Sequence, residues 1–335
     1  MSKLTVPERY HPVLTVYETQ KAIGVIKRIF EDNLSAALNL KRISAPLFVD
    51  PDSGLNDDLN GIERPVGFEI GKTELNAQIV QSLAKWKRMA LYRYGFPIGE
   101  GIYTDMNAIR RDEEMDNLHS VYVDQWDWEK VIERESRTTE FLSMTVRKIV
   151  NVICDTAEKI MELYPALNLN LLRNVQFITT QELENCYPHL SPRERENIYV
   201  KEHKTVFIMQ IGEVLSSGIK HDGRAPDYDD WTLNGDIMFW NDVLECAFEI
   251  SSMGIRVDET SLDSQLAKSG CDYRRNLPFH KMLLNGELPL TMGGGIGQSR
   301  LCMLMLKKAH VGEVQVSLWD ENTITGCKNA GIPIL

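Results

Sequence analysis

The amino-acid sequence predicts an α+β fold in which a mainly antiparallel sheet is flanked by helices. Segments with the composition of β-hairpins alternate with long amphipathic helices, and they contain no regular βαβ unit. The most glycine-rich stretch, residues 291–300, has neither the P-loop spacing nor the G-x-G-x-x-G spacing, because Gln298 stands where the third glycine would be. If this stretch binds a nucleotide, the fold is therefore neither a P-loop fold nor a Rossmann fold.

Hydrophobic spacing locates the helices and strands. Apolar residues three and four positions apart predict helices over residues 19–40, 83–94, 128–164 and 191–203, two shorter ones between 256 and 291, and another that begins near Gly297. Runs rich in β-branched and aromatic residues predict strands over 43–49, 77–82, 101–110, 119–126, 175–179, 205–211, 235–240 and 244–251, with 314–319 closing the sheet. We expect loops at 50–61, at 221–231 and at the glycine-rich stretch.

The composition is that of a globular protein. The chain of 335 residues is long enough for one large domain or two ordinary ones. Its net charge of −11 argues against nonspecific binding of nucleic acid but leaves open an anionic small-molecule substrate. No apolar run approaches the roughly 20 residues of a membrane helix, and no signal-peptide pattern is apparent, so we expect a cytoplasmic protein with no membrane partner. The cysteines form no C-x-x-C pair, which predicts reduced thiols.

The first predicted helix and the strand after it form a candidate dimer element. Pro46 lacks a backbone N–H and demotes the strand over 43–49 to an edge or an interface position. Simple core packing explains the same pattern, and the residues alone leave both interpretations open.

The glycine-rich stretch has the chemistry of a phosphate site. Gly294, Gly295 and Gly297 would let the backbone approach a ligand closely, and a helix that begins near Gly297 would present free N–H groups and a positive dipole end. Arg300, in the first turn of that helix, would add a fixed cation. The alternative is an ordinary turn whose arginine pairs with a surface acid.

Further charged residues complete a possible nucleotide site. Arg110 ends a predicted strand before a charged loop, and Asp236 and Glu249 lie on neighbouring predicted strands. Two arginines can hold separate oxygens of a nucleoside triphosphate, and two carboxylates suit Mg²⁺. The set predicts nucleotidyl transfer, in which the protein mainly positions groups and neutralises charge.

Two acidic loops are candidate ligand loops. Asp57 lies in the segment 50–61, and Asp229 lies in the segment 221–231 together with further aspartates. Most such runs are solvated turns, so the loops alone do not decide between a ligand site and a solvated surface.

In this order, the features resemble the three motifs of class II aminoacyl-tRNA synthetases. The first helix with its Pro46 strand resembles motif 1, Arg110 with its acidic loop and residues 121–125 resembles motif 2, and residues 293–300 resemble motif 3. This resemblance implies a class II synthetase-like core that forms a homodimer through motif 1.

The match is closer with one family, the ammonia-dependent asparagine synthetases or aspartate–ammonia ligases. The blocks that resemble this family are residues 82–88, 119–128, 224–231, 234–236, 251–256 and the glycine-rich stretch. The resemblance covers about residues 19–319 and implies one catalytic domain over 1–335. Between Trp231 and Asn234 the chain has a shorter segment than some relatives, which bears on how a loop there closes over the site.

The resemblance implies a two-step reaction that uses ATP and Mg²⁺. The β-carboxylate of L-aspartate attacks the α-phosphorus of ATP and gives β-aspartyl-adenylate and pyrophosphate. Ammonia then attacks the activated carbonyl and gives L-asparagine and AMP. The protein needs no nucleophile of its own, so its part is placement and charge neutralisation.

The resemblance also implies roles for single residues. Arg110 would act at the α-phosphate, Arg300 at the γ-phosphate end, and Asp57 and Asp229 at the ammonium or amino group. The implied residues for aspartate and ammonia are Lys85, Lys87, Gln125, Asp127, Arg224, Ser251, Ser252 and Arg256. The implied ATP-binding residues are Arg110, Glu113, Asp236, Glu249, Gly294, Gly295, Gly297 and Arg300, and Asp236 and Glu249 would also hold Mg²⁺. His119 and His221 are interpreted as structural residues.

Two alternatives share part of this pattern. An aspartyl- or asparaginyl-tRNA synthetase-like protein would form an adenylate and also bind tRNA, but the first predicted helix begins at residue 19, which leaves no room before it for an OB anticodon domain. A non-catalytic paralogue that binds nucleotide or amino acid would be expected to lose a charged group of the set, and the sequence retains them all. We therefore expect no nucleic-acid partner.

Overall fold

The computed structural model describes residues 4–57, 59 and 63–335, and their strands form one large and one small sheet. The large sheet has eight strands in the order β1-β5-β6-β11-β10-β9-β8-β7. The bounds are β1 Leu40–Arg42, β5 Gly101–Ile109, β6 Tyr122–Val131, β7 Gln176–Thr179, β8 Thr205–Met209, β9 Asp229–Asn241, β10 Cys246–Arg256 and β11 Thr291–Gly297. The edge pairs β1–β5 and β7–β8 run parallel and the pairs between them run antiparallel, which confirms the predicted fold class.

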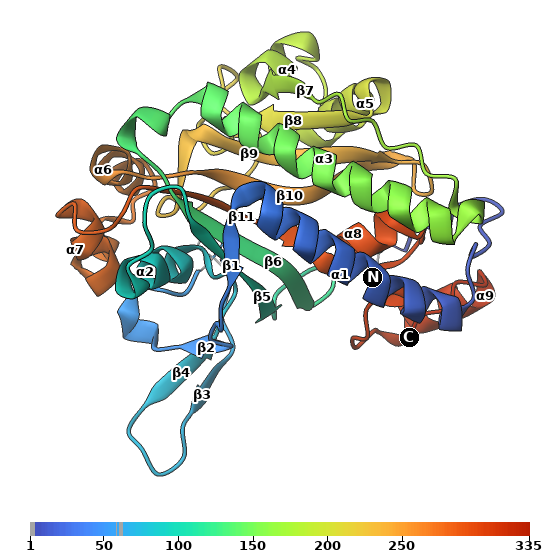
Figure 1. Cartoon of the computed structure of the whole chain (residues 1–335), viewed down its shortest axis with the longest axis horizontal. Helices are drawn as coiled ribbons and strands as arrows, with labels where there is room; N and C mark the ends of the chain where they lie inside the picture. The colour runs from blue at the N-terminus through green and yellow to red at the C-terminus, as the bar shows by residue number, and fades with distance from the viewer. Residues whose placement is uncertain (1–3, 58, 60–62) are drawn as a thin grey trace.

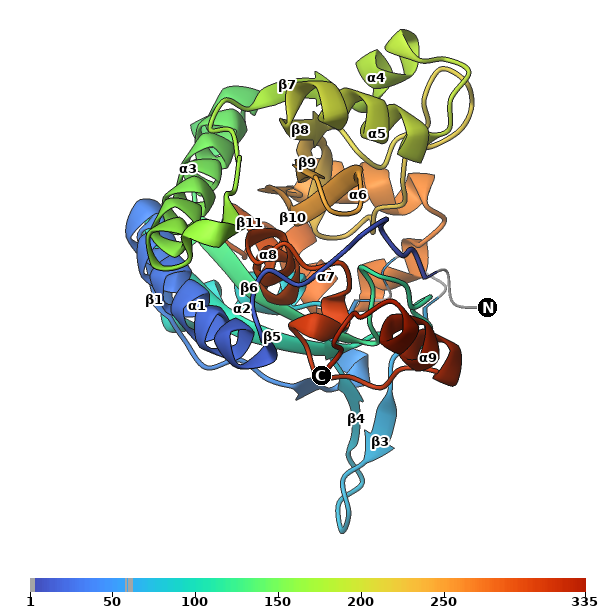
Figure 2. The ribbon, with the colours of Figure 1, turned by 90° about the vertical axis from the view of Figure 1, so that its right-hand side faces the viewer.

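Two long helices cover one face of this sheet. α1 (Val16–Leu38) and α3 (Thr139–Leu163) lie side by side along it, and α8 (Gln298–Met305) also packs there (Figures 1 and 2). Each long helix begins at a threonine whose side chain accepts from a main-chain N–H, Thr15 in α1 and Thr138 in α3. The other α-helices in the described residues are α2 Ala84–Tyr94, α4 Thr180–Cys186, α5 Pro192–His203, α6 Glu259–Lys268, α7 Pro278–Leu284 and α9 Glu321–Asn329. No helix in this part of the chain is both long and apolar enough to cross a membrane.

The small sheet extends away from the large one. β2 (Phe48–Val49) and β3 (Gly67–Glu69) each pair antiparallel with β4 (Asn76–Ile79), and the β3–β4 hairpin protrudes from the molecule (Figure 1). The prediction of one strand over 43–49 is therefore wrong, because β1 ends before this segment and β2 begins only at its end. Pro46 lies between the two strands, and it has no N–H to donate to either sheet.

The predicted helix over 128–164 is correct only from Thr139 onward. Its first residues belong to β6, where Trp128 pairs with Tyr103 on one side and with Gly294 on the other. A short apolar run fits a buried strand as well as a helix, and pairing with two neighbouring strands decides for the strand.

The predicted closing strand over 314–319 is wrong. Val311–Glu313 forms a single 3-10 turn, and residues 314–319 form no strand after it. Val316 and Leu318 are 70 % and 83 % exposed, so their β-forming side chains have no apolar layer against which to pack.

The glycine-rich stretch is a strand and not the predicted loop. β11 lies between β10 and β6 near the middle of the sheet, and α8 follows it directly at Gln298, close to the predicted start. Gly293 to Gly297 pair with residues 125–129 of β6 along the whole stretch. Backbone pairing with two neighbours therefore overrides the low strand propensity of glycine.

The segment after Trp231 is also a strand. β9 begins at Asp229 and continues through Asn234 to Asn241, so the expected loop over 221–231 ends at Tyr228. The short spacing between Trp231 and Asn234 therefore leaves no closing loop at this position.

Candidate active site

A cavity of about 490 Å³ opens on the face of the large sheet opposite α1. Gln125 of β6 lines the cavity, while the adjacent Trp126 packs against Phe30 of α1 on the other face. The predicted site residues that line it are Arg110, Glu113, Gln125, Arg224, Glu249, Ser252, Gly295, Gly297 and Arg300. The predicted residues outside its lining are Asp57, Lys85, Lys87, Asp127, Asp229, Asp236, Ser251, Arg256 and Gly294.

The floor of the cavity includes Gly295 and Ser252, which belong to a row of paired residues that crosses the sheet. Asp127 of β6 pairs with Gly295 of β11, Gly295 pairs with Ser252 of β10, and Ser252 pairs with Asp236 of β9. Directly paired residues point to the same face of a sheet, so these positions share the face of the cavity. The row brings together residues that were predicted to contact the amino acid and residues that were predicted to contact the nucleotide.

Glycines in β11 leave room for the side chains of the neighbouring strands. At Gly295, an added Cβ would overlap the Gln125 carboxamide and lie 2.8 Å from Asp127 Oδ1. At Gly293, it would overlap the Glu129 carboxylate. The space beside these glycines is therefore occupied by side chains of the protein, on the same face as the cavity.

A β-bulge in β10 turns Glu249 toward the cavity. Glu249 and Ser252 are three positions apart, a spacing that puts side chains on opposite faces of a regular strand. Their partners on β9, Met238 and Asp236, are only two positions apart, because Ile250 is the extra residue of a bulge. Glu249, Ser252 and Asp236 therefore share one face.

Two arginines reach the cavity. Arg300 Nη1 donates to the main-chain oxygen of Glu249 at 3.0 Å and lies 3.3 Å from its Oε2, and Arg300 Nη2 donates to His119 Nε2 at 2.8 Å. Arg110 Nη2 makes one long hydrogen bond, to the main-chain oxygen of Gln81 at 3.4 Å, and its Nε has no partner in the described part of the chain. A phosphate can therefore bind Arg110 without displacing a strong contact.

Asp236 and Glu249 form the acidic side of the site. Arg224 pairs with Asp236. Burial raises the pKa of Asp236 to about 8, with Glu249 adding to the shift and Arg224 opposing it. Burial also disfavours the charged form of Glu249, but Arg300 and Arg224 hold the pKa of Glu249 below its usual range. Each of the two carboxylates therefore has an arginine beside it, and both lie on one face of the site.

A buried lysine lies beneath the other end of the row. Lys87 of α2 is 1 % exposed, and its Nζ lies 3.0 Å from Asp127 Oδ2 and donates to the main-chain oxygen of Gly294 at 3.0 Å. Burial lowers the pKa of Lys87, although Asp127 opposes the shift. This ion pair is suited to the charged groups of an amino acid.

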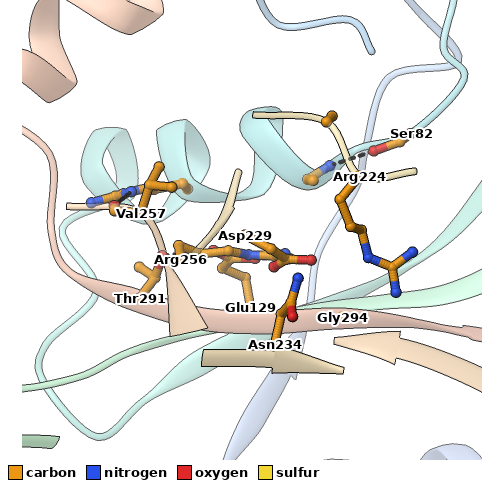
Figure 3. Close-up of polar contacts among 12 residues, drawn as sticks. Ser82, Glu129, Arg224, Asp229, Asn234, Arg256, Val257, Thr291 and Gly294 are labelled. Atoms are coloured by element: carbon orange, nitrogen blue, oxygen red, sulfur yellow. Dashed lines mark hydrogen bonds and ion pairs between the residues drawn. The ribbon is translucent and has the colours of Figure 1, made fainter. Parts of the chain in front are cut away.

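Arg256 lies in the same buried region and contacts two carboxylates (Figure 3). Arg256 Nε lies 3.0 Å and Nη2 lies 2.7 Å from Glu129 Oε2, while Nη1 pairs with Asp229. Thr291 Oγ1 donates to Glu129 Oε1 at 2.6 Å. Burial disfavours the charge on Glu129, but Arg256 and Lys87 hold the pKa of Glu129 below its usual range.

Comparison with known proteins identifies the family. The sequence model described as aspartate-ammonia ligase matches residues 17–331. The aspartate–ammonia ligase of Ruminiclostridium cellulolyticum is 59 % identical over 336 residues and 100 % of both chains. That of Lactobacillus acidophilus is 57 % identical over 335 residues, 99 % of this chain and 100 % of the other. The chain belongs to the aspartate–ammonia ligase family. The resemblance drawn from the sequence blocks is confirmed.

Solved structures agree with the fold of this aspartate–ammonia ligase family member. Asparaginyl-tRNA synthetase of Entamoeba histolytica, in complex with asparaginyl-adenylate, has a TM-score of 0.62 and 14 % identity over 90 % of this chain and 66 % of that chain. Asparaginyl-tRNA synthetase of Pyrococcus horikoshii, also complexed with asparaginyl-adenylate, has a TM-score of 0.59 and 14 % identity over 96 % of this chain and 77 % of that one. These matches confirm the predicted class II aminoacyl-tRNA synthetase-like fold.

In this aspartate–ammonia ligase family member, Lys85 contacts the protein itself at a distance from the cavity. Lys85 Nζ donates to Asp227 Oδ2 at 3.0 Å, and Arg274 Nη1 and His280 Nε2 each lie 2.9 Å from the same oxygen. These four side chains are buried. The contacts tie the loop before β9 to α2 and α7, so Lys85 is placed to hold that loop.

Two other predicted residues also lie away from the cavity. Ser251 pairs with Ile237 and Ile296, so it faces the helix side of the sheet while Ser252 faces the cavity. Asp57 is buried, and its Oδ1 accepts from the N–H of Leu59 at 3.0 Å. Positions 58, 60 and 61 of the predicted acidic loop lie outside the described residues.

Reasoning from the sequence did not single out Glu129 and assigned His119 a structural role only. Glu129 lies two positions after Asp127, so both side chains face the same side of β6. In the sequence, Glu129 falls within the helix predicted over 128–164, and the alternation of a strand was therefore not considered there. His119 lines the cavity and accepts from Arg300, which places it in the site. Its position as the first residue of the family-resembling block 119–128 was the available signal.

Proposed function

We propose that this chain synthesises L-asparagine from L-aspartate and ammonia with ATP, through a β-aspartyl-adenylate, and releases AMP and pyrophosphate. One observation carries the proposal. Gly295 lies between the open cavity with Arg110 and Arg300 and the buried ion pair of Lys87 and Asp127. A nucleotide in the cavity and an amino acid on the buried charges would meet above this residue.

In the first step, an oxygen of the aspartate β-carboxylate forms a bond to the α-phosphorus as the bond to pyrophosphate breaks. Negative charge grows on the phosphates in this step, and we assign its neutralisation to Arg110 at the α-phosphate and Arg300 at the γ-phosphate end. Glu113 lines the cavity, and its N–H donates to the main-chain oxygen of Arg110 at 3.1 Å, which supports a contact with ATP. The backbone of residues 294–297 would form the surface beneath the nucleotide.

The buried charges suit aspartate. Lys87 and Arg256 would bind its carboxylates, and Gln125 and Asp127 would bind its amino group. The Ser252 hydroxyl faces the same space. We leave Lys85 out of this set because its ammonium group contacts Asp227 of the loop before β9, whereas Lys87 contacts Asp127 of the row beside the cavity.

In the second step, the ammonia nitrogen attacks the activated carbonyl, a C–N bond forms, the C–O bond to AMP breaks and one proton leaves. Ammonia at neutral pH is mostly ammonium, so a carboxylate near the attack point helps to attract it and take its proton. Tyr228 lines the cavity, and burial raises its pKa with further contributions from Asp57 and Asp229. Asp57 and Asp229 thus add negative charge around Tyr228, which supports a role for them in this step.

Mg²⁺ fits the acidic side of the site. Asp236 and Glu249 supply carboxylate oxygens on one face, and the raised pKa of Asp236 reflects negative charge in a buried place. Mg²⁺ prefers oxygen ligands and usually binds through one or two carboxylates together with phosphates. When bound, the ion would neutralise phosphate charge.

We also propose a homodimer through α1 and the strands that follow it. Val13, Val16 and Tyr17 are 38 %, 45 % and 73 % exposed at the start of α1, and Leu47 and Phe48 are 51 % and 44 % exposed near β2. These apolar side chains support an interface. Sedimentation as a monomer at micromolar concentration would contradict it.

The reaction is tested by incubating the protein with ATP, Mg²⁺, L-aspartate and ammonium chloride. We expect asparagine, AMP and pyrophosphate in equal amounts, each dependent on ammonium for sustained turnover. ADP and phosphate in place of AMP and pyrophosphate would refute the adenylate route. Adenylate formation without asparagine, combined with charging of added tRNA, would favour a tRNA synthetase-like function.

A further inference from the structure

The guanidinium of Arg256 has two edges, and each contacts a different carboxylate. The edge formed by Nε and Nη2 binds Glu129, with Nε 3.1 Å from Oε1 and Nη2 2.7 Å from Oε2. Nη1, which belongs to the other edge, pairs with Asp229. A ligand carboxylate that binds an arginine through two parallel hydrogen bonds needs one whole edge. Glu129 holds one edge firmly, so the edge with Asp229 is the one that a ligand can use.

We propose that Asp229 is an internal carboxylate that neutralises Arg256 in the absence of substrate and gives way to a carboxylate of aspartate when the substrate binds. Glu129 remains in place and keeps Arg256 oriented during the exchange. This inference rests on the proposed function, which assigns Arg256 to aspartate. It adds to that function the replacement of Asp229 by a substrate carboxylate at Arg256. In the substrate-free protein the contact between Asp229 and Arg256 has the form of an ordinary structural ion pair.

The charge balance of the buried region favours such an exchange. Lys87, Arg256 and the neighbouring buried Arg88 supply three positive charges, and Asp127, Glu129 and Asp229 supply three negative ones. Aspartate would add two carboxylates and one ammonium group. A net negative charge added to this balanced buried region is costly unless a resident carboxylate moves away.

Access to Arg256 requires the same movement. Arg256 is 3 % exposed and Asp229 is 1 % exposed, and neither lines the cavity. Tyr228 does line it, and its ring lies 5.8 Å from the Arg256 guanidinium. Asp229 follows this cavity-lining residue directly in the chain and pairs with Arg256, so it adjoins both the cavity wall and the arginine.

The surroundings of Asp229 leave room for its side chain to move. Asp229 is the first residue of β9, and the pairing register between β9 and β10 breaks there, from Gly254 opposite Asn234 to Arg256 opposite Asp229. A Cβ at Gly254 would lie 2.9 Å from Asp229 Oδ1, so the glycine makes room for the carboxylate. The main-chain oxygen of Asp229 accepts from Gln265 Nε2 at 2.9 Å, so the exchange moves the side chain and leaves the strand in place.

Succinate is the probe that separates this exchange from a contact with the substrate amino group. Succinate has both carboxylates of aspartate but lacks the amino group. We would measure its dissociation constant by isothermal titration calorimetry with the wild-type protein, Asp229→Asn and Asp229→Ala. Without an internal carboxylate to displace, both variants should bind succinate about fivefold more tightly or better. If Asp229 only contacted the substrate amino group, the variants would bind succinate like the wild type.

Three further variants complete the experiment. Asp222→Asn removes a negative charge from the cavity lining at a position outside the Arg256 contacts, and Asp230→Asn removes a neighbouring buried carboxylate that pairs with Arg137 at 2.7 Å. Both should bind succinate within about twofold of the wild type, since neither holds Arg256. Glu129→Gln should bind succinate about tenfold more weakly, because Arg256 loses the partner that orients it.

Unchanged, weaker or undetectable succinate binding by both Asp229 variants overturns the exchange. Equal tightening by Asp222→Asn also overturns it, because the effect would then be a general loss of negative charge. The thermal midpoint of each variant shows that it is folded. The assay of asparagine, AMP and pyrophosphate by the wild-type protein reports separately on the proposed function, so the two proposals fail independently.

Discussion

The two ends of the cavity floor differ in how far their cations are satisfied by the protein. At the nucleotide end, the Arg300 side chain is 21 % exposed and Arg110 has one long hydrogen bond and an unpartnered Nε among the described residues. At the aspartate end, Lys87 and Arg256 are almost fully buried and bound to carboxylates of the protein. The first end is an open surface with spare donors, and the second is a closed network.

This difference matches the chemistry of the two ligands that we propose for these ends. ATP carries its own negative charge, and the cavity can accept it with few contacts broken. Aspartate is small and zwitterionic, so a site for it needs charges of both signs held in fixed places, and in the absence of ligand those charges stabilise one another. We therefore expect variants at the nucleotide end to affect catalysis and variants at the aspartate end to affect binding and stability together.

Arg110→Ala gives the largest expected effect and tests the open end. The variant removes a cation that is exposed to the cavity and weakly held, so the fold should be unaffected while adenylate formation falls by about 10²- to 10³-fold. Aspartate-dependent exchange of pyrophosphate into ATP measures this step without ammonia. Near-normal exchange would remove Arg110 from the mechanism, and a large fall in the thermal midpoint would mean that the open end is not independent of the core.

Gly295→Ala tests the boundary between the two ends. Its Cβ would overlap the Gln125 carboxamide and crowd Asp127 Oδ1, so we expect a loss of about 1–3 kcal/mol in stability. Displacement of these groups by a fraction of an ångström should lower asparagine synthesis by about ten- to a hundredfold. Gly297→Ala is the matched control. There the nearest atom to the new Cβ is Arg300 Cβ at 3.1 Å, and no atom comes as close as Gln125 does at Gly295, so the loss of stability should be smaller. Equal losses would show that the floor of the cavity is adaptable.

The sequence predicts most of the fold because the periods of two and 3.6 are visible in it. α1, α2 and α5 and the hairpin of β5 and β6 follow this pattern closely. Errors arose where pairing partners decide the structure. β11 is a strand because two neighbours pair with it, and the first part of the predicted helix over 128–164 is a strand for the same reason. A single segment does not reveal its neighbours.

The site could be predicted in composition but not in arrangement. Arg110, Arg300 and Glu249 line the cavity as expected. The side of the sheet to which Glu249 points depends on a bulge at Ile250. This bulge is visible only in the pairing between β9 and β10. Lys85 and Lys87 are equally good candidates in sequence. The choice between them depends on the contact of Lys85 with Asp227, which is distant along the chain.

The acidic side of the site allows a test by pH. Asp236 has a usual pKa of 3.8 that burial raises to about 8, so the folded protein binds more protons than the unfolded chain between these values. The free energy of unfolding without metal should therefore decrease as the pH rises from about 4 to about 8. At the proposed Mg²⁺ site the ion would compete with this proton, so the affinity for Mg²⁺ with ATP should fall by about tenfold per pH unit below about 8.

Calorimetry in two buffers of different ionisation enthalpy measures the proton released when Mg²⁺ and ATP bind. We expect release of up to one proton near pH 7 for the wild type and a smaller release for Asp236→Asn. Release that is the same in both proteins would exclude Asp236 as the titrating group. Insensitivity of the unfolding free energy to pH in this range would exclude the raised pKa.

The smallest expected effect concerns two adjacent serines on opposite faces of β10. Ser251 faces the helices, and its buried Oγ has no hydrogen-bond partner in the described residues, so Ser251→Ala should change activity by less than about twofold and leave stability equal or slightly higher. Ser252→Ala removes a hydroxyl from the floor of the cavity beside Gly295 and Asp236, and should raise the Michaelis constant of ATP or aspartate several-fold. The comparison depends on which face each serine occupies. A large loss of activity in Ser251→Ala with none in Ser252→Ala would require the opposite facing, and with it a different register between β9 and β10.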